Sequence, residues 1–148
     1  MKQTIEELQA VIERTPDRLR KIGEAESGVR PEAGEWSRKE ILGHLIDSAS
    51  NNHQRFVRAQ LTDALLAFPD YAQDGWVQVQ GYQQTPWQAL VELWAAYNRH
   101  LLHLMRHVNP DTLERRCKIG NDQPVSLAFL MQDYVRHLKH HLQQILSD

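Results

Sequence analysis

Apolar side chains recur at intervals of three and four residues through long parts of this sequence, and this interval marks one face of an α-helix. Alternating runs of Val and Ile, which are typical of strands, do not occur. The sequence therefore predicts an all-α fold. The clearest apolar stripe lies near the C-terminal end and consists of Leu127, Leu130, Met131, Tyr134, Leu138, Leu142 and Ile145.

Helix-start signals divide the chain into four helices. In "TIEE" and "WSRKEI", Thr4 and Ser37 each precede a glutamate by three residues, which is the spacing of a capping box. In "TPWQ", Thr85 is followed by a proline at the first helical position, where proline is favoured. A fourth helix should begin near Ser126, after Pro124. The predicted helices cover about 4–22, 37–66, 85–108 and 126–148.

The connections between these helices predict the topology. Residues 1–148 show no internal repeat and no linker, so we expect one four-helix-bundle domain. About 18 residues separate the second helix from the third, which is enough for a crossover that leaves those two helices parallel. Four aromatic residues in this segment predict a folded cover on the bundle; they are Phe68, Tyr71, Trp76 and Tyr82.

Composition and charge narrow the possible partners and location. With 17 basic and 19 acidic residues spread along 148 positions, the chain has a net charge of −2 and no basic patch for nucleic acid. It has no apolar stretch long enough to span a membrane, and its start does not resemble a signal peptide. The single Cys117 excludes an intrachain disulfide. We therefore expect a cytoplasmic protein with no nucleic acid or membrane partner.

Histidines gather in the stretch "DYVRHLKHHLQQI". His137 and His141 lie one helical turn apart on the apolar stripe, whereas His140 falls on the polar side. His44 lies near the apolar face of the second helix. Three neutral imidazoles from two helices, with open positions for water, can hold a catalytic divalent metal. The alternative is that each is a core histidine bonded to a carbonyl or a carboxylate.

Four stretches in order carry a resemblance to a known family: "WSRKEILGHLIDSASNNHQRF", "YAQDGWV", "LVELWAAYNRHL" and "DYVRHLKHHLQQI". Together they resemble the DinB-like proteins, and within them the YfiT-like branch of metal-dependent hydrolases and thiol transferases. The resemblance implies a four-helix bundle with a crossover between helices two and three. It also implies metal binding by His44, His137 and His141, with Gln144 and Ile145 completing the second motif, and often a homodimer.

Other metal chemistries do not fit the spacing. "HLKHH" lacks the glutamate of a zinc-protease motif, and no Glu-x-x-His motif is present for a di-iron site, so a mononuclear site remains. All-imidazole ligation suits zinc or nickel first, with iron and copper as further options. A metal with three neutral ligands keeps its full charge and attracts a thiolate or acidifies water. Protons should compete with the metal near pH 6.5, the ordinary histidine pKa.

Further polar and aromatic residues are candidates near this site. Asn52, two turns after His44, is expected either to line a polar pocket or to make a structural hydrogen bond. Trp76 either closes the site from the crossover or only anchors that segment. Asp47 is expected on a solvated helix face rather than behind a ligand. Cys117 is expected in a loop without a catalytic role, and no catalytic base is assigned.

A second group of histidines lies on the third predicted helix. His100, His103 and His107 have helical spacing, but they lie on the flank of the apolar stripe and are not expected to be ligands.

The leading functional hypothesis is a metal-dependent enzyme that activates a low-molecular-weight thiol for transfer to an electrophilic small molecule, as the resemblance implies. A metal-dependent hydrolase is one alternative. A non-catalytic, stress-related metal-binding bundle is the other. Open metal positions facing a pocket would favour an enzyme, and a fourth protein ligand would favour a structural site.

Overall fold

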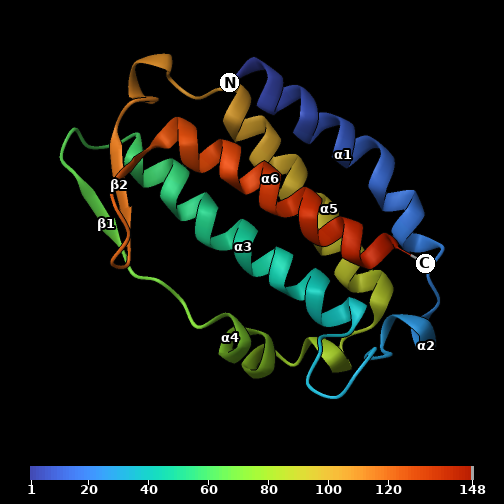
Figure 1. Ribbon diagram of the computed structural model, residues 1–148. Helices are drawn as coiled ribbons and strands as arrows, with labels where there is room; N and C mark the ends of the chain where they lie inside the picture. Colours follow the sequence, from blue (N-terminus) through green and yellow to red (C-terminus); the bar gives the residue numbers. More distant parts are fainter. Residues whose placement is uncertain (148) are drawn as a thin grey trace.

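The computed structural model describes residues 1–147 and contains four long helices. They are α1 (Lys2–Arg20), α3 (Arg38–Ala59), α5 (Trp87–Arg106) and α6 (Leu127–Leu146). Helix α3 packs against α5 and α6, and α1 packs against the same two helices, so the four close into a bundle (Figure 1). Helices α3 and α5 run in the same direction in Figure 1. The predicted four-helix bundle with a long crossover is therefore confirmed.

Shorter elements fill the connections. The crossover contains β1 (Leu66–Phe68), α4 (Gln73–Gln80) and the 3-10 helix η1 (Tyr82–Gln84). The other connections contain α2 (Glu24–Ser27), the 3-10 helix η2 (Pro110–Thr112), β2 (Arg116–Ile119) and β3 (Val125–Ser126).

The three strands form a small sheet in the order β1-β2-β3. Strand β1 pairs in parallel with β2, with Leu66 opposite Cys117, and β2 pairs antiparallel with β3. The sequence prediction of a purely helical chain missed this sheet, because strands this short do not show an alternating pattern. The small sheet lies at one end of the bundle (Figure 1).

The helix starts are partly as predicted. Ser37 makes the full capping box with Glu40, and Ser126 accepts a hydrogen bond from the Phe129 amide. Thr4, however, lies inside α1, which begins at Lys2. Thr85 does not cap α5, because the amide of Trp87 donates to the Glu24 carboxylate at 2.7 Å. A side chain 63 residues away thus replaces the predicted local cap.

Helix α3 ends at Ala59, well before the predicted end at Leu66. The Arg115 side chain donates to the carbonyls of Ala59 and Gln60, which are among the last acceptors of the helix. With these carbonyls satisfied, the chain continues towards β1 in a non-helical conformation. A residue from a distant connection therefore satisfies carbonyls at the end of α3.

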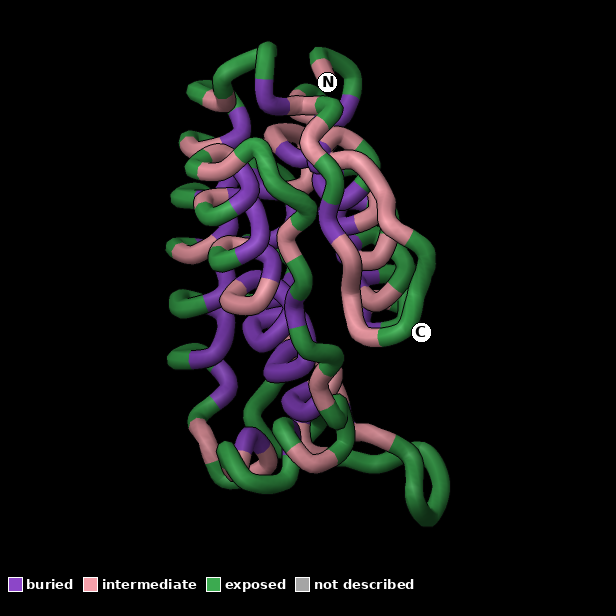
Figure 2. Tube along the Cα trace, turned by 90° about the vertical axis from the view of Figure 1, so that its left-hand side faces the viewer, coloured by how far each residue is buried: buried purple, intermediate pink, exposed green. Residues whose placement is uncertain are grey.

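Buried residues follow the inner faces of the long helices, and exposed residues lie on their outer faces (Figure 2). The largest fully buried side chains come from all four helices and include Leu8, Leu42, Phe56, Trp87, Trp94 and Met131. None of the helices within residues 1–147 combines the length and the apolar character that crossing a membrane requires.

The crossover packs on α3 through α4 and η1, and Tyr82 lies at this contact. The Tyr82 ring lies directly on Gly43, where an added Cβ would come within 2.1 Å of the ring. The Tyr82 hydroxyl donates to Oδ1 of Asp47 at 2.6 Å, and Nε2 of Gln80 donates to the same oxygen at 2.6 Å. The segment is thus a folded cover on the bundle, as its aromatic residues predicted.

Candidate metal centre

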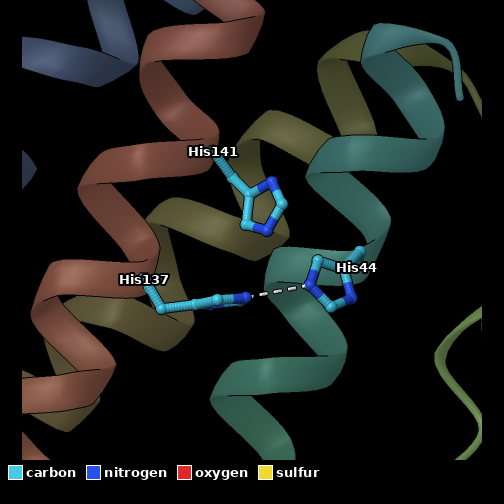
Figure 3. Close-up of side chains that lie close together, drawn as sticks. All are labelled: His44, His137 and His141. Atoms are coloured by element: carbon cyan, nitrogen blue, oxygen red, sulfur yellow. Dashed lines mark hydrogen bonds between the residues drawn. The ribbon is translucent and has the colours of Figure 1, made fainter.

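Three histidines from two helices converge where α3 packs against α6 (Figure 3). His44 comes from α3, and His137 and His141 are one turn apart on α6. Nε2 of His44 lies 3.1 Å from Nε2 of His137. One ring nitrogen from each histidine lies within 4.8 Å of the other two. The structure therefore brings together the three residues that the sequence pattern selected.

The imidazoles are neutral at ordinary pH. Burial, followed by the charges of neighbouring histidines, lowers the pKa of His44 and of His137 to about 4. Burial also lowers the pKa of His141, although its hydrogen bond to Gln144 acts in the opposite direction. Protons therefore compete for His44 and His137 at a lower pH than the 6.5 expected from sequence, because their surroundings disfavour the imidazolium form.

Gln144 fixes the orientation of one imidazole. Its carbonyl oxygen Oε1 lies 2.7 Å from Nδ1 of His141 and accepts the ring N–H. The other ring nitrogen, Nε2, then carries the lone pair that a metal ligand needs. The His44 ring packs against Trp36, with 5.1 Å between centroids, and its Nδ1 is buried without a partner among residues 1–147.

The residues present fit a divalent metal. Two nitrogens bound to zinc in tetrahedral geometry are about 3.3 Å apart, close to the observed 3.1 Å between His44 and His137. Within residues 1–147, no cysteine or carboxylate joins the three histidines in the group. Three protein donors are one fewer than the four that complete a tetrahedral zinc site.

The two pocket candidates have different positions. Asn52 is 8% exposed and donates to the Ser48 carbonyl at 2.9 Å. It also lines a pocket of about 230 Å³ that reaches His137, so it combines both expected roles. Trp76 is 38% exposed and lies beside Tyr71, with ring centroids 5.1 Å apart. It lines neither the pocket that contains His137 nor the one that contains His141.

Asp47 is the residue whose environment the sequence misjudged. It is buried, at 2% exposure, rather than solvated. Burial raises its pKa, whereas the hydrogen bonds from Tyr82 and Gln80 lower it, and Oδ2 has no partner among residues 1–147. Its position one turn after His44 was the one sequence signal that placed Asp47 near the histidines. The packing of the crossover over this part of α3, which buries Asp47, could not be predicted from sequence.

The other flagged side chains lie apart from the three histidines. His100 and His103 are exposed on α5, and exposed His107 follows the end of that helix. The His100 ring meets the His53 ring edge to face, and the His103 ring is tilted against the His107 ring. Cys117 lies in β2, not in a loop, and burial raises the pKa of its thiol, which makes it a poor nucleophile.

The fold and the site together define a helical bundle with a three-histidine centre able to hold a metal ion. The model of the DinB superfamily matches residues 7–145. The chain belongs to the DinB superfamily.

One curated relative is similar to most of this chain. The protein OB0782 of Oceanobacillus iheyensis, whose name proposes a metal-dependent hydrolase, is 26% identical over 115 residues. The alignment covers 78% of this chain and 66% of OB0782, just under two thirds of that protein.

Two solved structures share the fold. YfiT from Bacillus subtilis, described as a four-helix bundle of unusual topology and proposed to be a metal-dependent hydrolase, has a TM-score of 0.83 at 19% identity. The match covers 98% of this chain and 85% of YfiT. A histidine-to-alanine variant of the mycothiol-dependent maleylpyruvate isomerase has a TM-score of 0.80 at 13% identity. That match covers 99% of this chain but 61% of the isomerase.

Proposed function

We propose that His44, His137 and His141 bind one divalent metal ion, and that the centre activates a low-molecular-weight thiol for transfer to an electrophilic small molecule. The observation that carries the proposal is the convergence of three ring nitrogens within 4.8 Å without a fourth protein ligand among residues 1–147. Bound there, the metal would lower the pKa of a coordinated thiol or water. Zinc or nickel is the expected ion.

The protein's own residues would serve this chemistry by supplying neutral donors. Because burial keeps the pKa of His44 and of His137 near 4, their nitrogens are unprotonated at neutral pH. Gln144 holds the His141 ring with Nε2 free. Neutral donors leave the charge of the ion uncompensated, and this favours an anionic partner such as a thiolate.

The relatives support two versions of the chemistry. The mycothiol-dependent isomerase shares the fold and depends on a thiol, which favours thiol transfer. The name of OB0782 favours hydrolysis, in which the same centre would activate water. We place thiol transfer first, hydrolysis second and a non-catalytic metal site third.

We also propose a homodimer, which sedimentation at high protein concentration would test.

The test begins with metal content. Protein purified without a histidine tag should contain one divalent ion per chain by elemental analysis. His44→Ala and His141→Ala should lose it while keeping their helical content, since the core is large enough to fold unaided. His140→Ala is the matched control and should keep the ion, because it is exposed and outside the group. Full metal content in His44→Ala and His141→Ala would overturn the proposal.

The second stage tests the reaction. The metal-loaded protein is screened with a panel of thiols against a panel of electrophiles, and with esters and amides as hydrolysis substrates. Metal-dependent loss of free thiol supports transfer. Metal-dependent hydrolysis without thiol supports the second candidate. A metal-loaded protein inactive in both screens would favour the non-catalytic alternative.

A further inference from the structure

A pocket of about 230 Å³ runs from the histidine centre towards the small sheet. His137 lines it, and so do Ser48, Asn52 and Arg55, which follow His44 along α3. The spacing between these α3 residues is three and four, so they lie on one side of the helix. The pocket therefore connects the centre with a stretch of α3 that the proposed thiol chemistry does not use.

Arg55 is the unusual residue of this pocket. It is 9% exposed, yet within residues 1–147 it forms no hydrogen bond and no ion pair within 4.0 Å. Its nitrogens are not among the side-chain atoms that are fully buried without a partner, so the guanidinium faces the open space of the pocket. Burial lowers the pKa of Arg55, but a guanidinium stays charged in proteins. A largely buried cation with free donors is suited to bind an anion.

Nearby carboxylates do not neutralise this cation. Asp133 is paired with Arg136. Asp70 and Asp122 are exposed at the rim of the pocket, and Asp70 contributes only a longer-range attraction to Arg55. Arg55 thus lines the pocket without a partner among the described residues, and no carboxylate among them lies within ion-pair distance of its side chain.

We infer that Arg55 binds the carboxylate of a small-molecule ligand that occupies this pocket. The planar guanidinium offers two parallel N–H donors that match the geometry of a carboxylate. Arg55 follows His44 by eleven positions, which is about 16 Å along the axis of α3. The ligand is therefore elongated, with its carboxylate several bonds away from the atom that lies at the histidines.

The carboxylate has two chemical sources, because many low-molecular-weight thiols carry one and so do many electrophilic acceptors. The proposal that the end of the ligand opposite its carboxylate lies at the metal rests on the proposed function. The carboxylate site at Arg55 does not rest on it, because Arg55 is present with or without a metal.

Three probes separate these contributions: 8-mercaptooctanoate, its neutral amide 8-mercaptooctanamide, and octanoate. Each is titrated by ligand-observed NMR into wild type, Arg55→Met and Arg99→Met, both metal-free and zinc-loaded. Arg99 is an exposed arginine on α5 and serves as the matched control. Arg55→Met should bind both carboxylates about tenfold to hundredfold more weakly, the range of a charge-assisted hydrogen bond. The amide should be unaffected, and Arg99→Met should behave like wild type.

Stability gives a second readout that a purely structural role would not produce. Removing an unpaired buried cation should leave the melting temperature of unliganded Arg55→Met equal to or above that of wild type. If Arg55 instead pairs with Asp70, both Arg55→Met and Asp70→Asn should lower the melting temperature. That result, or unchanged carboxylate binding by Arg55→Met, would overturn the inference.

The same titrations keep this inference separate from the thiol proposal. Octanoate binding that depends on Arg55 supports the anion site. If zinc at the same time fails to strengthen the binding of 8-mercaptooctanoate, contact between the metal and the thiol is contradicted. Zinc-enhanced thiol binding that is unchanged in Arg55→Met contradicts the anion site alone. Octanoate that still binds through Arg55 when zinc and 2-mercaptoethanol saturate the centre supports an acceptor carboxylate. Octanoate that no longer binds once zinc and 2-mercaptoethanol occupy the centre supports a carboxylate on the thiol, because a separate acceptor then has no room beside the bound thiol.

Discussion

The hydroxyl of Tyr82 lies 2.6 Å from Oδ1 of Asp47 and donates a hydrogen bond to it across 35 residues of sequence. Asp47 is one turn after His44 on α3, so this bond joins the crossover to the helix that carries the first histidine of the centre. Burial raises the pKa of Asp47, and the bonds from Tyr82 and Gln80 oppose that rise. The tyrosine therefore partly stabilises a buried carboxylate.

Tyr82→Phe should lower the free energy of unfolding by about 1–3 kcal/mol, because a buried acceptor loses one donor. Urea denaturation of the metal-free protein measures the change. Tyr97→Phe is the control, since Tyr97 is only half-buried and its oxygen lies 3.3 Å from Nδ1 of His53. Equal losses in the two variants would contradict a special role for the Tyr82–Asp47 bond.

Gly43→Ala should destabilise the protein by about 1–3 kcal/mol, although alanine favours helices, because the new methyl group would collide with the Tyr82 ring. In α4, Gly75→Ala meets only ordinary contact with Ala72 at 3.7 Å and should be neutral or stabilising by up to about 1 kcal/mol. Thermal melting compares the two. An unchanged or higher melting temperature for Gly43→Ala would show that the ring can move away from α3.

Gln144→Leu should weaken metal binding by about tenfold to hundredfold, since it removes the acceptor that orients the His141 ring. Competition with a chelator of known affinity measures the change. Gln144→Glu keeps an acceptor and should retain most of the affinity, and Gln143→Leu, at the exposed neighbouring position, should retain all of it. Wild-type affinity in Gln144→Leu would remove Gln144 from the site.

The stability of the metal-free protein should fall as the pH falls from about 6.5 to 4. In this window an unfolded histidine takes up a proton, whereas His44 and His137, each with a pKa lowered to about 4, do not. The unfolded state therefore binds more protons, and acid favours it. For buried His44 alone the loss by pH 4 is about 3 kcal/mol.

The comparison that isolates this effect is His44→Ala in the presence of chelator. This variant should show a smaller fall in the free energy of unfolding over the same pH range, as measured by urea denaturation. Parallel pH profiles for wild type and His44→Ala would mean that His44 is not kept neutral by the fold.

Local sequence signals predicted much of the architecture. The stripe on α6 and the capping box at Ser37 depend on residues within a few positions of each other, so the pattern determines them directly. The position of His137 and His141 on the inner face of α6 follows from the same periodicity. The approach of His44 follows once α3 and α6 pack through their apolar faces.

What the sequence did not predict depends on distant partners. Glu24 accepts a hydrogen bond from the first amide of α5, Tyr82 donates one to Asp47, and Arg115 donates one to a carbonyl at the end of α3. None of these contacts has a periodic signal. The sequence also did not predict that Arg55 is largely buried without a partner among the described residues. An arginine on a helix is normally solvated, and the burial of Arg55 depends on the sheet and the crossover around it.

The parallel pairing of β1 with β2 joins two segments about 50 residues apart and belongs to the slowest class of contacts to form. It rests on a few backbone bonds between short strands rather than on a long helix packed into the core. We therefore expect amide hydrogens of β1 and β2 to exchange with solvent well before those of α3 and α6. Since Ile119 and Val125 of this sheet line the pocket that holds Arg55, local unfolding of the sheet would admit an elongated ligand while the helices, and the histidines they carry, stay in place.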